Sequence, residues 1–227
     1  MADMIAEEAH TLGMRAERLG ERALILRDLP IAPHVAADAL MEVAGVQEAV
    51  ASYETVGVYF YDRVRSVQEV TSTLSDALSL VQTVDEGGVL RTIPVCYEFG
   101  EDLRATAEQL DLPEDEVISV HLSVEYLCFA VGFAPGFGYL GYLPEAIAGV
   151  GRLDTPRTRV EPGSVAITGR QTAVYPQATP GGWRMIGRTP LTMVDVEDDY
   201  FPLSAGDRVR FTRIDAREFE RLRGERL

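Results

Sequence analysis

Apolar and polar positions in the first 90 residues follow two alternating patterns. Short runs of β-branched, aromatic and other apolar residues predict strands, and segments in which apolar residues recur at helical spacing predict helices. Five segments follow in the order strand, helix, strand, strand, helix: 23–26, 34–44, 46–51, 55–61 and 66–81. With a candidate closing strand at 90–95, this order predicts a small ferredoxin-like split βαβ domain.

The stretch Asp-Glu-Gly-Gly at 85–88 fits poorly inside a packed element and predicts a hinge. We therefore expect one domain over residues 1–88 and a second domain over residues 89–227. The second domain opens with alternating elements before its composition changes. These opening elements are a strand at 91–97, helices at 102–110 and 113–121, and a buried strand at 124–133.

Glycine and proline punctuate the next part of the second domain. Of the 20 glycines 11 lie between Gly132 and Gly187, and seven of the 12 prolines lie between Pro135 and Pro190. They separate short apolar strands, which is typical of an all-β barrel or sandwich, so the whole chain is expected to be α+β. The predicted strands are 164–168, 172–175, 183–186, 191–194 and 207–214. Residues 215–226 are predicted to form an exposed C-terminal helix.

The charge of the chain excludes several classes of function. Its 227 residues carry 36 acidic and 21 basic side chains, a net charge of −15. Nucleic acid and anionic membranes need a basic protein face, so neither partner is expected. All 21 basic residues are arginine, and without lysine the chain has no Walker A loop, no pyridoxal Schiff base and no lysine nucleophile. Arginine keeps its proton, so these cations can bind carboxylates or phosphates but cannot transfer protons.

Histidine and cysteine are scarce in this sequence. The three histidines and two cysteines lack the spacing of metal ligands, so no metal site is expected. Two cysteines do not make a disulfide framework, and the first ten residues lack the basic start and apolar stretch of a signal peptide. No apolar run of about 18 residues is present, so we expect a cytoplasmic protein without a transmembrane helix.

The charge is distributed unevenly along the chain. Residues 126–192, which we call the basic island, hold three acids and six arginines, a local charge of +3, and the other 160 residues carry −18. Arginines on glycine-rich loops suit a small anionic ligand such as a carboxylate or phosphate. Salt bridges to the acidic remainder of the chain explain the excess equally well. The six arginines are Arg152, Arg157, Arg159, Arg170, Arg184 and Arg188.

Residues 133–141, FAPGFGYLG, place three aromatic residues among three glycines. Aromatic rings form rigid apolar walls and glycines allow a tight backbone, so this run is a candidate cavity rim with Phe133 and Tyr139 as binding residues. The alternative is a barrel corner, because turns use the same residue types.

Three motifs follow one another in the second domain: GFAPGFGYLGYLP, TPRTRVEPGSVAITGRQTAVYP and TPGGWRMIGRTPL. In this order and spacing they resemble the KipI / allophanate hydrolase subunit 1 family, and the resemblance spans nearly the whole chain. It implies a ferredoxin-like N-terminal domain and a cyclophilin-like β-barrel C-terminal domain.

The family resemblance further implies a subunit of an ATP-dependent 5-oxoprolinase, which opens the lactam of 5-oxoproline to glutamate. Its implied partners are a homologous-fold second subunit, of the C type, and a third subunit, of the A type. ATP, with Mg, would be bound by the complex rather than by this chain alone. Two other functions stay open: a regulatory protein that inhibits a histidine kinase, and a subunit of an allophanate or urea-processing amidohydrolase.

His121 and Arg188 are the candidate catalytic residues within the matched region. A histidine side chain ordinarily titrates near neutral pH, which suits a general acid or base, and a buried histidine bonded to the backbone is the equal alternative for His121. Arg188 in GRTP and Arg157 in TPR are candidate anion clamps, because the carboxylate of 5-oxoproline or a phosphorylated intermediate needs bidentate donors.

Gln171 and Tyr175, in RQTAVYP, are candidates for hydrogen bonds to the lactam edge, with ordinary barrel pairing as the alternative. Where the family usually reads VPAGSV this chain reads VEPGSV, so we expect Glu161 to neutralise Arg157 or Arg159 in part. Cys128 lies in an apolar run and is expected in the core.

Overall fold

The computed structural model describes residues 8–11, 13–81 and 88–227. The chain divides into two compact units, Met1–Glu86 and Gly87–Leu227. Three residues of the predicted hinge, 85–87, lie outside the described residues. No helix of the described part is long and apolar enough to cross a membrane.

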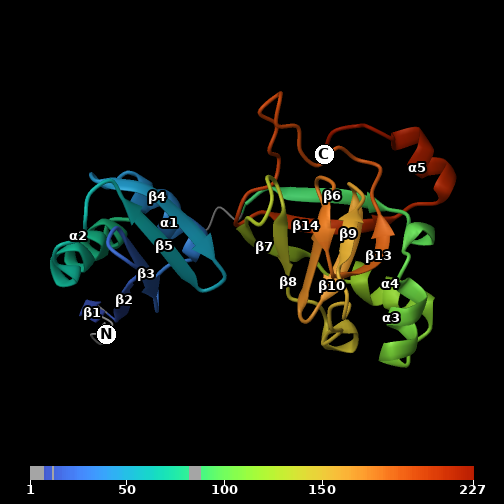
Figure 1. Cartoon of the computed structure of the whole chain (residues 1–227), viewed down its shortest axis with the longest axis horizontal. Coiled ribbons are helices and arrows are strands. Elements are labelled where there is room, and N and C mark those ends of the chain that lie inside the picture. The colour runs from blue at the N-terminus through green and yellow to red at the C-terminus, as the bar shows by residue number, and fades with distance from the viewer. Residues whose placement is uncertain (1–7, 12, 82–87) are drawn as a thin grey trace. The chain divides into compact units, whose positions relative to one another are not determined.

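The first unit is a five-stranded antiparallel sheet with two helices (Figure 1). Strand β5 lies between β3 and β4, and α1 connects β3 to β4, which is the predicted split βαβ arrangement. The two helices contact each other as well as the sheet, so they cover the same face. The elements are β1 (Glu8–Thr11), β2 (Met14–Arg18), β3 (Ala23–Arg27), α1 (Pro33–Met41), β4 (Val46–Ser52), β5 (Thr55–Phe60) and α2 (Val67–Ser79).

The strand predicted to complete this sheet, residues 90–95, belongs to the second unit instead. The position beside β3 is taken by β2, which pairs with β3 in antiparallel register and buries Met14 and Ala16. Strand β6 (Leu90–Val95) pairs in parallel with β14 (Arg208–Arg213) over its whole length. The apolar pattern therefore identified the strand but assigned it to the wrong sheet, because that pattern carries no information about the partner.

The second unit is built on a seven-stranded sheet in the order β13-β10-β11-β8-β7-β14-β6. Its two edges meet where Cys96 follows β6 and Arg188 ends β13: the N–H of Cys96 donates to the carbonyl of Arg188 (2.8 Å), and the N–H of Arg188 donates to the carbonyl of Cys96 (3.0 Å). The sheet is thus a nearly closed barrel. The remaining strands are β7 (Tyr126–Val131), β8 (Gly138–Gly141), β10 (Ser164–Thr168), β11 (Gln171–Val174) and β13 (Arg184–Arg188).

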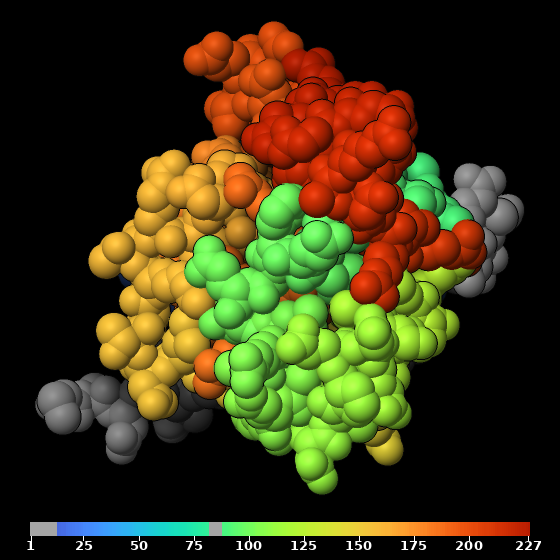
Figure 2. All heavy atoms as spheres, turned by 90° about the vertical axis from the view of Figure 1, so that its right-hand side faces the viewer, coloured from blue at the N-terminus to red at the C-terminus, as the bar shows by residue number. Residues whose placement is uncertain are grey.

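The second unit also contains a separate pair of strands and several helices. Strands β9 (Arg157–Val160) and β12 (Thr179–Gly181) form a separate two-stranded sheet. Helix α5 (Ala216–Leu222) packs against η1 (Tyr97–Phe99), and Figure 2 shows the red C-terminal segment lying against this green surface. The other helices are α3 (Leu103–Leu110), α4 (Glu114–Leu122) and η2 (Glu145–Ile147).

The two faces of the barrel strands enter two different apolar clusters. On β10, Val165 and Ile167 belong to the large interior core, together with residues of α3 and α4, whereas Ala166 points to the opposite face. That outer face carries a second cluster, which contains the aromatic side chains Phe137, Tyr175 and Trp183. Alternation along single strands therefore builds the interior core and the outer cluster at the same time.

The predicted α+β fold class, a small split βαβ domain followed by a barrel domain, is confirmed. Residues 191–194 do not form the predicted strand, although Met193 and Val194 are buried. The analysis of the sequence also missed strands β1, β2, β8, β9 and β12. Other strands of four or five residues were predicted, such as β10 and β11, so length is not the reason. The missed strands consist mainly of polar, glycine and proline residues and therefore lack an apolar strand pattern.

Candidate functional site

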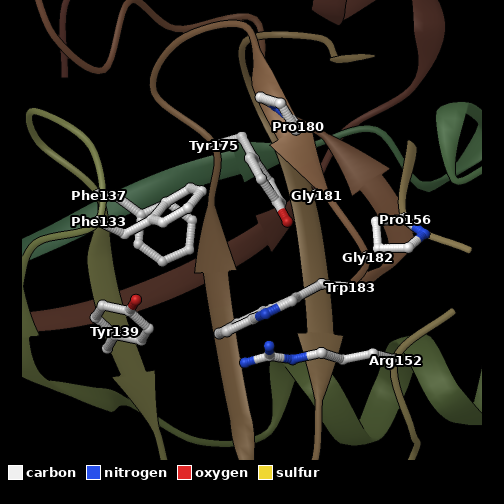
Figure 3. Close-up of a pocket in the computed structure, with 10 residues that line it drawn as sticks. All are labelled: Phe133, Phe137, Tyr139, Arg152, Pro156, Tyr175, Pro180, Gly181, Gly182 and Trp183. Atoms are coloured by element: carbon white, nitrogen blue, oxygen red, sulfur yellow. The ribbon is translucent and has the colours of Figure 1, made fainter. Parts of the chain in front are cut away.

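A cleft of about 300 Å³ opens over the outer aromatic cluster of the second unit (Figure 3). We call it the aromatic cleft. Three segments that are distant in the sequence converge on it: the glycine-rich run before β8, the loop before β9, and the end of β12. Its lining residues are Phe133, Phe137, Tyr139, Arg152, Pro156, Tyr175, Pro180, Gly181, Gly182 and Trp183.

Phe137 is the centre of the aromatic wall. It is almost completely buried, and four rings surround it in edge-to-face geometry. Their centroids lie 5.0 to 5.7 Å from that of Phe137, and they belong to Phe133, Tyr139, Tyr175 and Trp183. Edge-to-face contacts of this kind hold the rings in fixed orientations, so the wall is preorganised for a ligand.

The hydroxyl of Tyr175 points toward Gly181 (Figure 3). A Cβ atom at Gly181 would lie 2.4 Å from that oxygen, so only glycine fits there. Burial raises the pKa of Tyr175 above its ordinary value, although the backbone N–H of Trp183 bonds to the hydroxyl and opposes this effect. The phenol therefore keeps its proton at neutral pH and can donate a hydrogen bond.

Arg152 is the cation of the aromatic cleft, and its side chain points into the cleft next to Trp183 (Figure 3). Among the described residues, its guanidinium has neither a hydrogen bond nor an ion pair. The other five arginines of the basic island each have a partner. The pairs are Arg157 with Asp102, Arg159 with Glu161, Arg170 with the ring of Tyr142, Arg184 with the carbonyl of Gly151, and Arg188 with the carbonyl of Pro162. Salt bridges to the acidic remainder of the chain thus account for Arg157, while Arg159 pairs with Glu161 inside the island, and Arg152 pairs with no acid of the described residues.

Two further donors in the cleft lack a hydrogen bond to the described residues: the indole N–H of Trp183 and the hydroxyl of Tyr139. None of the described lining residues is acidic. The cleft therefore combines an aromatic wall with a cation and with donors that have no acceptor. Chemically, this arrangement accepts a small molecule with a flat apolar body, a carbonyl group and an anionic group.

Of the residues predicted from the sequence, the structure brings Phe133, Tyr139 and Tyr175 together in this cleft. Sequence reasoning did not select Arg152 and Trp183 as site residues. Membership of the basic island was the available signal for Arg152, and the preceding glycine pair was the signal for Trp183. Neither signal distinguishes a ligand-binding residue from one that pairs within the protein.

His121 lies in the interior core and has no exposed surface. The hydroxyl of Thr172 donates to the carbonyl of Ala166 (3.2 Å), so it accepts from Nε2–H of His121 (2.9 Å). Nδ1 then accepts from the hydroxyl of Tyr97 (2.8 Å). Burial lowers the pKa of His121 to about 3, so the ring is neutral at physiological pH. Both ring nitrogens are thus paired inside the core, as in the buried-histidine alternative but with side-chain partners, and the acid–base role stays a prediction.

Arg157 lies outside the aromatic cleft, and its charge is already compensated. Its Nη2 donates to Oδ1 of Asp102 (2.8 Å), a buried carboxylate whose other oxygen accepts the N–H of Met185 (2.8 Å). Glu161, expected to neutralise Arg157 or Arg159, pairs with Arg159 at 2.7 Å. The Nη1 atom of Arg157 is buried and has no hydrogen-bond partner among the described residues, so the role of Arg157 as an anion clamp stays a prediction.

Arg188 and Gln171 are also outside the aromatic cleft. Arg188 lines a second cleft of about 430 Å³ together with residues near α5, and its Nε donates to the carbonyl of Pro162 (3.0 Å). Gln171 pairs with Gly141 and Thr168 in the barrel sheet. The predicted site residues thus fall into separate places, and only the aromatic ones share a cavity.

The thiols and acids of the described chain offer no further catalytic centre. Cys96 and Cys128 are buried, and burial raises the pKa of the Cys128 thiol to about 12, so this thiol stays protonated. Cys128 is in the core, as expected. No group of three or more histidine, cysteine or acidic side chains among the described residues is placed to hold a metal ion.

Fold and site together define the class of this protein: a split βαβ unit followed by a barrel domain that carries a small-molecule cleft on its outer face. The family model for the carboxyltransferase domain, subdomain C and D, matches residues 14–203. The chain belongs to this family, and the resemblance identified from the three motifs is confirmed.

Several relatives in this family share sequence with the chain. The 5-oxoprolinase B subunit of Bacillus subtilis (strain 168) is 34% identical over 95% of this chain and 99% of that protein. The 5-oxoprolinase B subunit of Escherichia coli O157:H7 is 48% identical over 52% of this chain and 56% of that protein.

Solved structures agree with the fold. The crystal structure of TTHA0988 matches with a TM-score of 0.73 and 32% identity over 86% of this chain, which spans 41% of that longer chain. The urea carboxylase of Kluyveromyces lactis has a TM-score of 0.65 at 16% identity, over 92% of this chain and 22% of that chain. At that identity the likeness shows a shared fold and nothing about the reaction.

Proposed function

We propose that this chain is a subunit of an ATP-dependent 5-oxoprolinase and works in the cytoplasm. The observation that carries the proposal is the similarity to the Bacillus subtilis 5-oxoprolinase B subunit, which extends over nearly the full length of both chains. In the proposed reaction, water adds to the lactam carbonyl of 5-oxoproline, the ring C–N bond breaks, and glutamate forms as ATP is hydrolysed to ADP and phosphate.

The aromatic cleft gives this chain a part in that reaction. 5-Oxoproline is a small ring that carries a carboxylate and an amide, and the cleft offers an aromatic wall, the unpaired cation of Arg152 and several free donors. The described lining residues include no general base and no acid. The contribution of this chain is therefore to bind and orient the substrate, and the groups that activate water come from elsewhere in the complex.

ATP is assigned to the assembled complex rather than to this chain. The sequence contains no lysine, so a phosphate-binding loop of the Walker type is absent. The described acids do not gather into a magnesium site. We propose that a second subunit of homologous fold, together with a third subunit, supplies the site for ATP and Mg²⁺ and completes the active enzyme.

Reconstitution tests this proposal directly. The chain is co-expressed with the two proposed partner subunits, and glutamate release from 5-oxoproline is followed with and without ATP. The expected result is ATP-dependent release by the full complex and none by any preparation that lacks one of its components. ATP-independent release by this chain alone, or no release by a complete and folded complex, would contradict the proposed function.

A further inference from the structure

The aromatic cleft has an unusual charge balance for a site that would handle amino acids. Its cation, Arg152, lacks a counter-ion among the described residues, and no described lining residue is acidic. Asp102 is a buried acid that does not line the cleft, and it already binds Arg157 and the N–H of Met185. A ligand in this cleft therefore finds a charged partner for a negative charge, and no charged partner for a positive charge among the described lining residues.

We propose that the aromatic cleft binds small cyclic carboxylates whose ring nitrogen is uncharged, and that it discriminates against free amino acids, including the ring-opened product. The identity of the ligand as 5-oxoproline rests on the proposed function. The selectivity itself rests on the residues of the cleft. Arg152 binds the carboxylate, and the uncharged lactam lies where Arg152 would repel an ammonium group.

The carboxylate half of this recognition follows from Arg152. A guanidinium presents parallel N–H groups that match the two oxygens of a carboxylate. Arg152 is exposed to solvent, so the strength of this pairing comes from its bidentate geometry rather than from burial. The unpaired state of Arg152 in the described structure leaves these donors ready for a ligand.

The lactam half follows from the aromatic wall and its hydroxyl groups. The planar amide of 5-oxoproline packs on an aromatic ring, and Tyr139, Tyr175 and Trp183 each bring a donor to the cleft for its carbonyl oxygen. Each of these groups can donate a hydrogen bond to a carbonyl oxygen. None of them carries a negative charge that would offset the repulsion between Arg152 and an ammonium group.

Discrimination against amino acids follows from what the cleft lacks. Proline has the same five-membered ring and carboxylate as 5-oxoproline, but its ring nitrogen is a charged ammonium at neutral pH. Placing this charge beside Arg152, without an acidic partner, costs both its hydration and the repulsion of two cations. Glutamate carries the same ammonium, so ring opening weakens binding in the cleft and favours release of the product.

The sequence supplies a convenient reporter, because Trp183 is the single tryptophan of the chain and lines the cleft. The full chain without partners is titrated with 5-oxoproline, proline, glutamate and 2-pyrrolidinone, which is the same lactam without the carboxylate. Tryptophan emission and titration calorimetry are recorded in parallel, so a ligand that leaves emission unchanged is still detected. Arg152→Gln tests the cation, and Arg159→Gln, which removes an exposed arginine of the same island outside the cleft, is the matched control.

We expect 5-oxoproline to bind, and proline, glutamate and 2-pyrrolidinone each to bind at least about tenfold more weakly. Arg152→Gln should weaken 5-oxoproline binding about tenfold to a hundredfold while leaving the melting temperature unchanged, and Arg159→Gln should bind as the unaltered chain does. Equal binding of proline or 2-pyrrolidinone, equal affinities of the two arginine variants, or no binding by either readout would overturn the inference.

These outcomes are separable from those of the reconstituted complex. If the complex releases glutamate while the isolated chain fails to bind 5-oxoproline, the inference about the cleft is wrong and the proposed function stands. If the chain binds with the expected preferences and the complex releases no glutamate, the cleft selectivity stands and the proposed function is wrong.

Discussion

His121 in the interior of the barrel and Arg152 in the aromatic cleft on its outer face have opposite surroundings. Inside, both nitrogens of His121 are hydrogen-bonded, and its backbone carbonyl accepts the hydroxyl of Tyr126 (2.8 Å). In the cleft, Arg152 and the indole N–H of Trp183 have no partner among the described residues. A polar group whose hydrogen bonds are all made within the protein stabilises the fold, whereas donors without a protein partner around a cavity indicate a binding site.

This difference teaches that residue type alone is a poor guide to chemistry in this family member. Histidine is the more typical catalytic residue, yet here it is neutral, buried and satisfied. Arginine is the more typical surface residue, yet Arg152 of the basic island lines a cleft and has no ion pair among the described residues. Four predictions sharpen or break the contrast between the two regions, in addition to the binding experiment on Arg152.

The largest expected effect is on stability and comes from His121→Ala. The change removes a fully buried ring and leaves the Tyr97 hydroxyl without an acceptor, so we expect a loss of about 3 to 5 kcal/mol. Urea denaturation measures the loss, with His34→Ala as the control, since His34 is only half-buried. A loss below that of the control would contradict the structural role of His121.

The second effect comes from Asp102→Ala, which strands the partly buried charge of Arg157 and the N–H of Met185. We expect a loss of about 2 to 4 kcal/mol in the free energy of unfolding, because one partner of a buried pair is removed. The folded variant should lose less 5-oxoproline affinity than Arg152→Gln does.

Glu161→Ala is the control for Asp102→Ala, since it removes an exposed partner of Arg159 and should leave the melting temperature unchanged. If Asp102→Ala abolishes binding while preserving stability, the division between structural and binding charges is wrong.

A third effect concerns pH. Because the pKa of His121 falls from its ordinary 6.5 to about 3 on folding, the unfolded chain binds a proton between these values that the folded chain does not. Stability is therefore lost as pH decreases through this window, by about 1.4 kcal/mol for each pH unit from this residue. Melting temperatures between pH 7 and 4 should fall less steeply for His121→Gln, which cannot titrate. Parallel curves for the two proteins would show that His121 is not the buried neutral group described.

The smallest effect comes from Gly181→Ala in the wall of the cleft. The added methyl group would lie 2.4 Å from the hydroxyl oxygen of Tyr175, so the wall must shift, at a cost of about 1 to 3 kcal/mol. Weaker 5-oxoproline binding should accompany this loss. Gly151→Ala is the matched control, because no atom lies within 4 Å of its added Cβ. If both variants bind and unfold alike, Tyr175 does not hold the position described.

Much of the fold was predictable because its elements have strong local patterns. Residues 66–81 predict a helix from apolar spacing, and α2 (Val67–Ser79) begins after Ser66, whose hydroxyl accepts the N–H of Glu69 at 3.2 Å. The strand with which a given strand pairs could not be predicted from such local patterns. Strand β6 was assigned to the first sheet and lies in the second, because pairing depends on residues more than a hundred positions away.

The candidate site was predictable only in its apolar half. The run at 133–141 predicted Phe133 and Tyr139 as lining residues, because aromatic residues among glycines can form a rigid apolar wall. Arg152 was not distinguished from the five other arginines of the basic island. Which arginine meets an acid depends on the distances between segments, and no local pattern encodes those distances.

The sequence by itself determined the α+β class and the family. It also predicts a small anionic ligand, because its cations are all arginines. Only the tertiary structure decided which groups are free to bind it. His121 is enclosed by the core and Arg157 is paired with Asp102, while Arg152 faces an aromatic cavity without a partner among the described residues. The physical reason is that hydrogen bonds and ion pairs form between neighbours in space, so folding determines which polar groups are already satisfied and which still need a partner.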